Sequence, residues 1–130
     1  MKRALFMLLV LASLLSPQDK KRKPKPAEVQ VLSASAHRMQ GTIVLDGKVK
    51  NAGERPVEKL ILLFDFMAAG RQVITTQKGP AESERLDPGQ ETEFRLEMND
   101  AVRAVEFRIQ AEDGDGRELT VRKGGPFPIE

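Results

Sequence analysis

With 130 residues, of which 40% are hydrophobic and 31% are charged, the chain is long enough for one domain with a single core. It has no cysteine, tryptophan or tyrosine. This excludes disulfides, thiolate nucleophiles and cysteine metal sites, together with the exposed Trp and Tyr platforms of sugar and single-strand binders. The net charge of +2 is uneven, because residues 27–130 hold 14 lysines and arginines against 18 aspartates and glutamates, a net charge of −4.

The first 16 residues have the pattern of a secretory signal peptide, with two basic residues before an apolar run over residues 4–15. A helix of this length spans about 18 Å, short of the roughly 30 Å hydrocarbon core, so a membrane-spanning anchor is the weaker interpretation. The pattern predicts export to the periplasm, the cell surface or the medium, with a mature N-terminus between residues 17 and 20. An uncleaved, membrane-associated N-terminus is the alternative.

Residues 17–27 are predicted to form a basic, proline-rich linker. Its five cations are Lys20, Lys21, Arg22, Lys23 and Lys25. Alternating lysine and proline disfavours helix, because each proline fixes its own φ and restrains the residue before it. The linker is either a stiff charged spacer or a segment attracted to anionic lipid or envelope polymer. An exported chain does not meet nucleic acid, so no nucleic-acid partner is predicted.

From residue 28 onward, short segments of alternating polarity are separated by turn signals, and no segment has a long helical period. The predicted strands span residues 29–36, 42–51, 57–66, 72–77, 91–98, 103–111 and 119–122. Residues 78–90, rich in glycine, proline and charge, are predicted to be a long surface connection. An Asp-Gly turn is predicted to join the last two strands as a hairpin.

Alternation also assigns the inward face of four strands. The residues predicted to point inward are Ile43, Leu45, Gly47 and Val49; Leu60, Leu62, Phe64 and Phe66; Phe94, Leu96 and Met98; and Val105, Phe107, Ile109 and Ala111. Seven strands in about 100 residues predict an all-β fold, namely a seven-stranded antiparallel sandwich of immunoglobulin or fibronectin type III architecture. The domain is expected over residues 28–125, with a tail at 126–130. A partly open barrel is the alternative.

One stretch resembles a known domain family. Residues 61–65 (ILLFD) are similar, with two conservative replacements of aromatic residues, to the motif that names the FxLYD-type β-sandwich domains of exported bacterial and archaeal proteins. The segments GKVKNAGERPVEKL, AAGRQVITT and LDPGQETEF resemble the corresponding strand, turn and loop signals, so the similarity covers about residues 40–112. The resemblance implies a β-sandwich in an exported protein and brings no catalytic residues.

No reactive constellation stands out in the sequence. His37 is the single histidine, and it is expected in an exposed polar loop without the nucleophile and orienting group that a catalytic base needs. The run 113–116 (DGDG) lacks the later ligands of an EF-hand, because Arg117 and Gly124 occupy their positions. A tight turn is the favoured interpretation. The sequence therefore predicts no enzyme, no cofactor, no metal site and no small-molecule substrate.

The strand predicted at 57–66 departs from the usual pattern on the face opposite the core. That face and its continuation carry Ile61, Leu63, Asp65 and Met67. A solvent-facing antiparallel sheet should be polar there, so this face is expected to be covered. Either neighbouring side-chain stems such as that of Arg108, or the tail 126–130, lie across it. The alternative is a patch for a protein partner, reached by sheet packing or by strand addition at an edge.

These observations predict an exported, non-enzymatic β-sandwich that acts as a binding or accessory module of the cell envelope, with a protein as its partner. The alternative is an envelope-surface or membrane-tethered structural protein held by the basic linker. Salt separates the two hypotheses. Attachment through the linker should vanish near about 0.5 M salt, whereas an apolar interface should persist.

Overall fold

The computed structural model describes residues 27–130, so the predicted signal peptide and the cations of the linker lie outside the described residues. All regular structure in this part of the chain is β-strand, which confirms the all-β prediction. No helix in this part is long and apolar enough to cross a membrane.

Six strands are long and five consist of two residues. The long strands are β1 (Val29–Met39), β2 (Thr42–Asn51), β4 (Ile61–Met67), β5 (Val73–Pro80), β7 (Glu91–Asn99) and β8 (Glu106–Glu112). The short strands are β3 (Val57–Glu58), β6 (Arg85–Leu86), β9 (Glu118–Leu119), β10 (Val121–Arg122) and β11 (Phe127–Pro128). The described residues thus contain eleven strands where alternation predicted seven.

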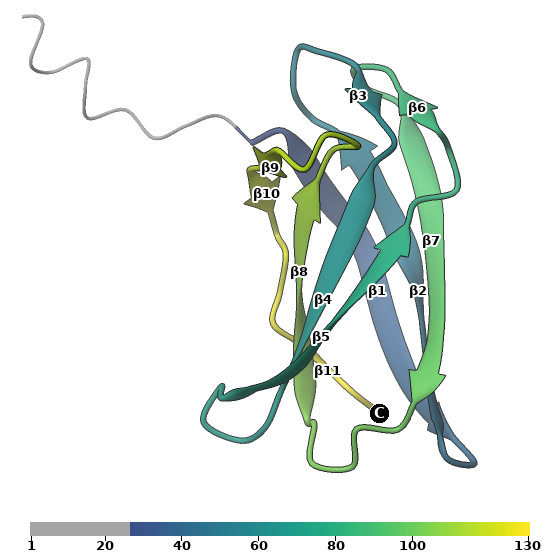
Figure 1. Cartoon of the computed structure of the whole chain (residues 1–130), viewed down its shortest axis with the longest axis vertical. Helices are drawn as coiled ribbons and strands as arrows, with labels where there is room; N and C mark the ends of the chain where they lie inside the picture. The colour runs from purple at the N-terminus through teal and green to yellow at the C-terminus, as the bar shows by residue number, and fades with distance from the viewer. Residues whose placement is uncertain (1–26) are drawn as a thin grey trace, which may run out of the picture.

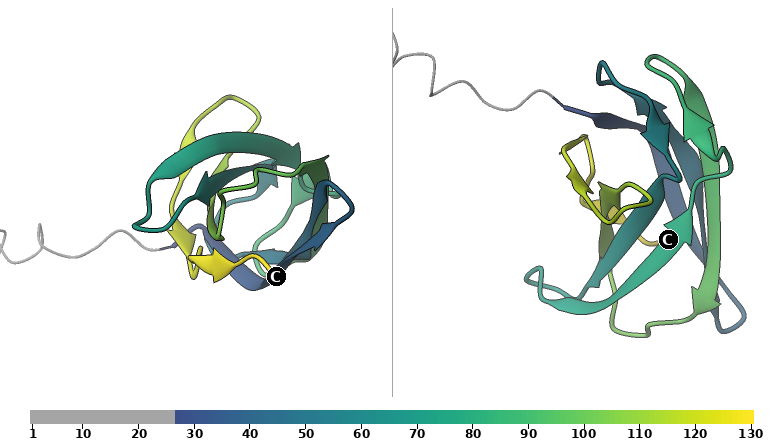
Figure 2. Two further views of the ribbon diagram at one scale, coloured as in Figure 1. Left: turned by 90° about the horizontal axis from the view of Figure 1, so that it is seen from below. Right: turned by 45° about the horizontal axis from the view of Figure 1, so that its top comes forward.

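Two larger sheets form the body of the domain and face each other as two layers (Figures 1 and 2). The first sheet has the order β10-β1-β2-β7, and the second has the order β11-β8-β4-β5, with β9 also on β8. The short strands β3 and β6 pair separately. The prediction of wholly antiparallel sheets is wrong at one position, because β10 runs parallel to β1.

The core lies between the two layers and follows the predicted alternation in most strands. The largest fully buried side chains include Ile43, Leu45, Leu62, Phe64, Phe66, Phe107 and Ile109. Phe64 of the second sheet packs against Phe94 of the first, with ring centroids 5.5 Å apart. Gly47 is required on β2, because a Cβ there would lie 2.6 Å from the Phe94 ring and 2.1 Å from the Ser33 carbonyl oxygen.

The alternation fails at the start of β8. Val105, expected inside, is 48% exposed, whereas Ala104 is buried. The strand begins only at residue 106, and a turn in which the Ala104 N–H donates to the Ala101 carbonyl precedes it at 2.8 Å. The prediction of a strand over residues 103–111 was therefore wrong for residues 103–105. These residues precede the strand, and their side chains do not alternate between two faces.

The segment expected to be a tail is part of the domain. Phe127 of β11 pairs with Phe107 of β8 and packs against its ring, with centroids 5.3 Å apart. The Glu130 N–H then donates to the Ala36 carbonyl of β1 at 2.9 Å. Residues 126–130 therefore bridge the side of the two layers between β8 and β1, and they do not cross the outward side of β4.

The predicted long connection at 78–90 is also more ordered than expected. Strand β5 continues to Pro80, and β6 pairs with β3 within the remaining segment. The Ala81 N–H extends the pairing with β4 by donating to the Leu60 carbonyl at 3.0 Å. Turn-forming residues predicted a loop here, but long-range pairing overrides that local preference.

Candidate functional site

Strand β4 lies at the centre of the second sheet, between β5 and β8. Its residues Leu62, Phe64 and Phe66 belong to the core, so the alternate residues point away from the first sheet. We call the solvent side of the second sheet the outer face. It comprises Ile61, Leu63 and Asp65 of β4, Thr76 and Lys78 of β5, and Arg108, Gln110 and Glu112 of β8.

Asp65 is the polar centre of the outer face and is only 6% exposed. Its carboxylate accepts hydrogen bonds from the Thr76 hydroxyl and the Gln110 amide, both at 2.7 Å. The Arg108 guanidinium donates to the same carboxylate, with Nη2 at 2.8 Å from Oδ2. One acid on the central strand therefore binds side chains of both neighbouring strands.

The protonation of Asp65 follows from these contacts. Burial alone would raise the pKa of the Asp65 carboxyl, but hydrogen bonds from Thr76, Arg108 and Gln110, together with the Arg108 charge, outweigh it. The pKa of Asp65 is therefore lowered from its ordinary value of 3.8. The group is ionised at neutral pH and is unsuited to act there as a general acid.

The apolar part of the outer face is half-buried. Lys78 lies opposite Leu63 on β5, and Glu112 lies opposite Ile61 on β8. The Lys78 ammonium and the Glu112 carboxylate form an ion pair of 3.0 Å, so the two side chains meet across β4. This arrangement matches the expected cover by neighbouring side-chain stems, and the Lys78 side chain remains 64% exposed.

Met67 was expected on the same face, but it is 2% exposed and offers almost no surface. A register shift separates Phe66 from Met67, which places Met67 opposite Val73 on β5. On β8 its neighbour is Glu106, which is paired with Arg71 at 3.7 Å. Met67 is therefore not part of the accessible surface of the outer face.

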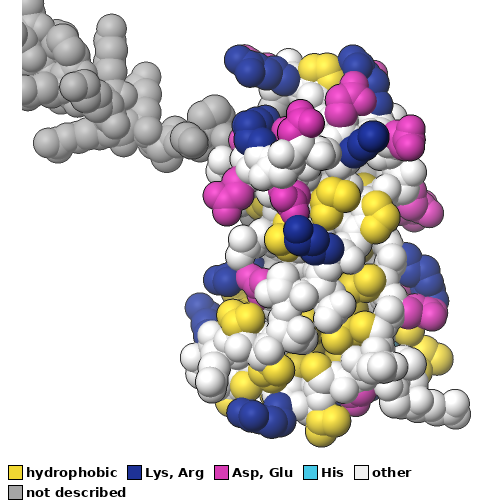
Figure 3. Space-filling view, in the orientation of Figure 1, with side chains coloured by type: hydrophobic (Ala, Val, Ile, Leu, Met, Phe, Trp, Pro, Cys, Tyr) yellow, Lys and Arg dark blue, Asp and Glu magenta, His cyan; other side chains and the backbone are white. Residues whose placement is uncertain are grey.

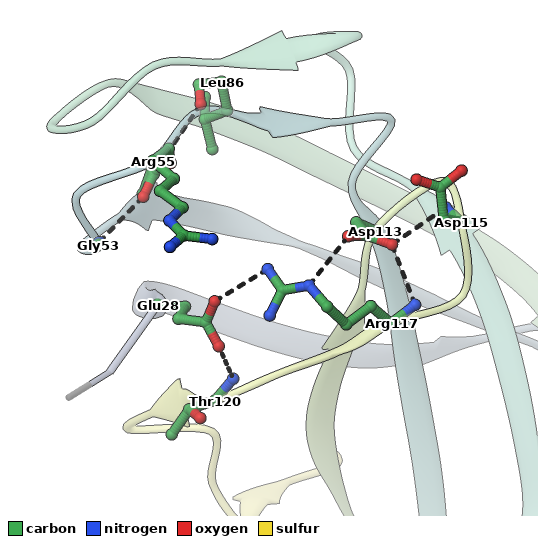
Figure 4. Close-up of polar contacts among 9 residues, drawn as sticks. Glu28, Gly53, Arg55, Leu86, Asp113, Asp115, Arg117 and Thr120 are labelled. Atoms are coloured by element: carbon green, nitrogen blue, oxygen red, sulfur yellow. Dashed lines mark hydrogen bonds and ion pairs between the residues drawn. The ribbon is translucent and has the colours of Figure 1, made fainter. Parts of the chain in front are cut away.

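A second polar cluster lies at the end of the domain where residue 27 begins (Figure 4). The Arg117 guanidinium donates to Glu28 at 3.1 Å and lies 3.4 Å from the Asp113 carboxylate. Glu28 also accepts the Thr120 N–H at 3.2 Å. We call this region, with the connections 52–56 and 113–117, the polar end.

Asn51 fixes the neighbouring connection and is fully buried. Its amide donates to the carbonyls of Arg55 and Leu86, both at 2.8 Å, and its oxygen accepts the Gly53 N–H at 2.9 Å. A cleft of about 490 Å³ lies against residues 51–57, Ala27, Glu28 and Arg117. The sequence predicted only a turn here, because nothing local indicates that Asn51 is buried.

The DGDG segment forms the predicted hairpin turn between β8 and β9. The Asp113 carboxylate accepts the backbone N–H groups of Asp115 and Arg117, both at 3.0 Å. The hydrogen bond from the Arg117 backbone is the main cause that lowers the pKa of Asp113. This carboxylate is thus engaged in holding the turn.

The remaining candidates from the sequence are the possible metal ligands, His37 and the linker cations. Within residues 27–130, no three His, Asp or Glu side chains come close enough to bind a metal ion. His37 is exposed, and it lies in β1 rather than in the expected loop, because β1 continues to Met39. The candidate contacts Lys20, Lys21, Arg22, Lys23 and Lys25 lie outside the described residues.

No protein-family model matches the chain, and no curated protein sequence matches it. Several solved structures are similar to it. One is beta-glucuronidase 2 of Bacteroides uniformis, covalently bound to cyclophellitol-6-carboxylate aziridine, with a TM-score of 0.54 and 13% identity over 74% of this chain. The match covers 14% of the glucuronidase, so the likeness concerns one small part of that enzyme.

Two smaller proteins are also similar. IRMA from Escherichia coli has a TM-score of 0.48 and 12% identity, covering 78% of this chain and 95% of that chain. The C-terminal domain of wzt has a TM-score of 0.47 and 12% identity, covering 81% of this chain and 83% of that chain. At these identities the comparisons concern the fold and assign no function.

Proposed function

We propose that the chain is an exported, non-enzymatic binding or accessory module of the cell envelope, and that it contacts a protein partner through the outer face. The contact would centre on Ile61 and Leu63, with Asp65 linking β4 to its two neighbouring strands. Two half-buried aliphatic side chains in the middle of a solvent-facing sheet carry this proposal. Exposed apolar surface of this kind is typical of interaction sites.

The first sheet supports the proposal by contrast. Its outward side pairs opposite charges directly across strands β2 and β7. These pairs are Asp46 with Arg95, Lys48 with Glu93 and Lys50 with Glu91. Such charge pairs are typical of a sheet surface that faces water, although β1 of this sheet also exposes Leu32. The outer face of the second sheet instead has two half-buried aliphatic residues on β4, with the Lys78–Glu112 ion pair reaching across the strand. The Lys78 side chain is 64% exposed, so a partner could displace it towards solvent.

The proposal includes the seven-stranded immunoglobulin-like architecture. What supports it is that six strands have seven residues or more and divide between two facing sheets. In this interpretation the short strands β9, β10 and β11 together take the place of a seventh strand. The strands β3 and β6 are then a local addition. Membership of the FxLYD-type family stays a prediction from residues 40–112.

The substitution Leu63→Glu tests the function. A carboxylate at this position should abolish an apolar contact at the centre of the outer face. Chemical cross-linking of the purified chain in an envelope extract, followed by identification of the captured proteins, measures the effect. Leu32→Glu is the matched control, because Leu32 is an aliphatic residue of the first sheet with 40% of its surface exposed.

We expect Leu63→Glu to lose a partner that both the wild type and Leu32→Glu retain, with unchanged circular dichroism for all three proteins. If the same proteins are captured by all three chains, the outer face is not the binding surface. An equal loss in both variants would also overturn the proposal, because a general rise in acidity would then explain it.

We also propose a second role, in which the linker cations attach the domain to an anionic surface. The segregation of charge favours it, since five cations lie within residues 20–25 whereas residues 27–130 carry a net charge of −4. Cations at a membrane surface contribute about 1 kcal/mol each. Sedimentation with anionic vesicles should disappear near about 0.5 M salt and on replacement of the five cations by glutamine. Persistence in either condition contradicts this role.

A further inference from the structure

The cleft at the polar end lies where the linker joins the domain. Its volume is about 490 Å³, and Ala27, the last residue of the predicted linker, is part of its wall. The rest of the wall comes from residues 51–57, Glu28 and Arg117. Half of the lining residues are alanine, glycine, proline or valine, so the wall offers apolar surface beside its charged groups.

Backbone pairing fixes the point from which the linker leaves the domain. The Ala52 N–H donates to the Glu28 carbonyl at 3.0 Å, and the Glu28 N–H donates to the Thr120 carbonyl at 2.8 Å. Residue 28 is thus held between two segments of the polar end. A chain of three residues spans at most about 11 Å, so Lys25 stays in the surroundings of the cleft.

The net negative charge of the domain lies around the same end. Residue 28 and the segments 52–60, 81–87 and 112–123, which lie at or near the polar end (Figure 1), contain ten acids and six lysines or arginines, a net charge of −4. The other described residues contain eight of each and are balanced. Figure 3 shows charged side chains over the top of the molecule, where this end lies. The domain is therefore negative where a linker with five cations joins it.

The charged groups of the cleft wall differ in whether they already have partners. Glu28 is paired with Arg117, which also meets Asp113. Glu54 is exposed and forms no ion pair among the described residues, and the same is true of Arg55. A cation that enters the cleft would therefore find Glu54 as an available partner and Arg55 as an opposing charge.

We propose that the segment 20–26 of this same chain folds back into the cleft. The rings of Pro24 and Pro26 would pack against the apolar part of the wall, and the Lys25 ammonium would pair with Glu54. Two observations select this occupant. It is attached to the cleft wall at residue 27, and its charge is opposite to that of the polar end. The inference concerns a contact within one chain and does not depend on protein binding at the outer face.

Such a contact would control when the linker cations are available. Cations held at the polar end cannot bind an anionic surface, so docking in the cleft competes with the second role proposed above. Because the segment is tethered to the cleft, its effective concentration there is in the millimolar range. Exposed ion pairs are individually weak and are screened by salt. A surface with many anionic groups would therefore be able to displace the domain from the linker.

The absence of tryptophan makes docking measurable, because one introduced tryptophan supplies the whole tryptophan signal. Acrylamide quenching of the indole would be measured on the purified full chain carrying Pro24→Trp. No vesicles are present, so the result is independent of the second role. In this background Glu54→Gln removes the proposed partner and Arg55→Gln removes the opposing charge. The matched control is Glu97→Gln, at an exposed acid of the first sheet.

We expect the quenching rate of Pro24→Trp to rise about twofold or more between about 0.1 M and about 0.5 M salt, because salt releases the docked segment. At the lower salt concentration, Glu54→Gln should raise the rate, Arg55→Gln should lower it, and Glu97→Gln should leave it unchanged. Equal quenching at both salt concentrations would overturn the proposal. Equal effects of Glu54→Gln and Glu97→Gln would also overturn it, because net charge alone would then explain them.

The amide NMR spectrum provides a second measurement that needs no tryptophan. Replacement of the five linker cations by glutamine should shift the amide resonances of residues 52–55 and leave those of Gly41 and Val102, at the opposite end, unchanged. Shifts confined to residues 27–29 would overturn the proposal, because they would report only the covalent connection. Shifts at residues 52–55 that depend on protein concentration would also overturn it, because the cleft would then hold the linker of a second copy.

Discussion

The two ends of the domain are closed in similar ways but present opposite surfaces. Connections between strands form both ends. We call the end opposite residue 27 (Figure 1) the apolar end, because its connections and the strand ends beside them expose Met39, Val73, Ile74, Val102 and Val105. Arg117 forms the main polar contacts at the polar end, and Arg38 forms those at the apolar end. Arg117 is 56% exposed and pairs with two carboxylates. Arg38 is 32% exposed and also bonds backbone carbonyls. One arginine balances surface charge, and the other supports a loop.

This difference shows which polar and apolar groups have partners within the domain. At the polar end, Asp113 and Arg117 pair with each other, and Asn51 bonds the nearby backbone. At the apolar end, Arg38 and Asp100 hold the loop, and Ala101 and Ala104 pack against the core, but Val102 on the same loop is 82% exposed. The apolar end is therefore the part of the surface whose composition folding does not explain.

The largest effect is expected at Asn51. Replacement by alanine leaves the Arg55 and Leu86 carbonyls without their donor inside the polar end, which should cost about 3 kcal/mol of unfolding free energy. Urea denaturation followed by circular dichroism measures the loss. Asn99→Ala is the control at the opposite end, where the residue is exposed, and it should change stability by less than about 0.5 kcal/mol. Similar losses in both variants would contradict the assigned role of Asn51.

Next in size is the contrast between the two arginines. Arg38→Ala should cost about 2 kcal/mol, because it removes bonds to Asp100 and to two carbonyls at once. Arg117→Ala should cost less than about 1 kcal/mol, because exposed ion pairs contribute little. Thermal and urea unfolding of the two variants provide the comparison. A larger loss for Arg117→Ala would reverse the roles given to the two ends.

The sequence predicted those features that depend on neighbouring residues. A period of two placed Leu62, Phe64 and Phe66 inside, and it placed Ile61, Leu63 and Asp65 on the opposite side of β4. The Asp-Gly turn was predicted from the positive φ that such turns need, and Gly116 has a φ of 84°. Local pattern and local geometry were sufficient in these cases.

Features that depend on distant residues could not be predicted in the same way. Asp65 meets Arg108 across 43 positions of sequence, so its near-complete burial on an outward face has no local signal. The pairing of Phe127 with β8 and the bond between Arg38 and Asp100 also join residues that are distant in sequence. Val105 shows the opposite case, in which a local pattern gave a wrong prediction. The alternation of side chains placed Val105 inside, but the residue lies before the start of β8, where its N–H donates to the distant Met67 carbonyl and its side chain is exposed.

Acid should weaken the outer face through the protonation of Asp65. The pKa of Asp65 is lowered in the folded state, so its contribution to stability is complete above the ordinary value of 3.8 and is lost as pH falls through the lowered value. Asp65→Asn should cost about 1 kcal/mol at pH 7. Urea unfolding between pH 7 and pH 2 should show the wild type and the variant converging in acid. Parallel curves over this range would contradict the assignment.

The smallest effect is expected at Val102, and it sharpens the comparison most directly. Because this side chain is 82% exposed, Val102→Ser should change the unfolding free energy by less than about 0.5 kcal/mol. Val57 lies near the polar end and is 6% exposed, so Val57→Ser should cost about 2 kcal/mol. Denaturation of both variants tests the difference. A marked loss for Val102→Ser would mean that this valine serves the fold itself, and the apolar end would then need no external partner to account for it.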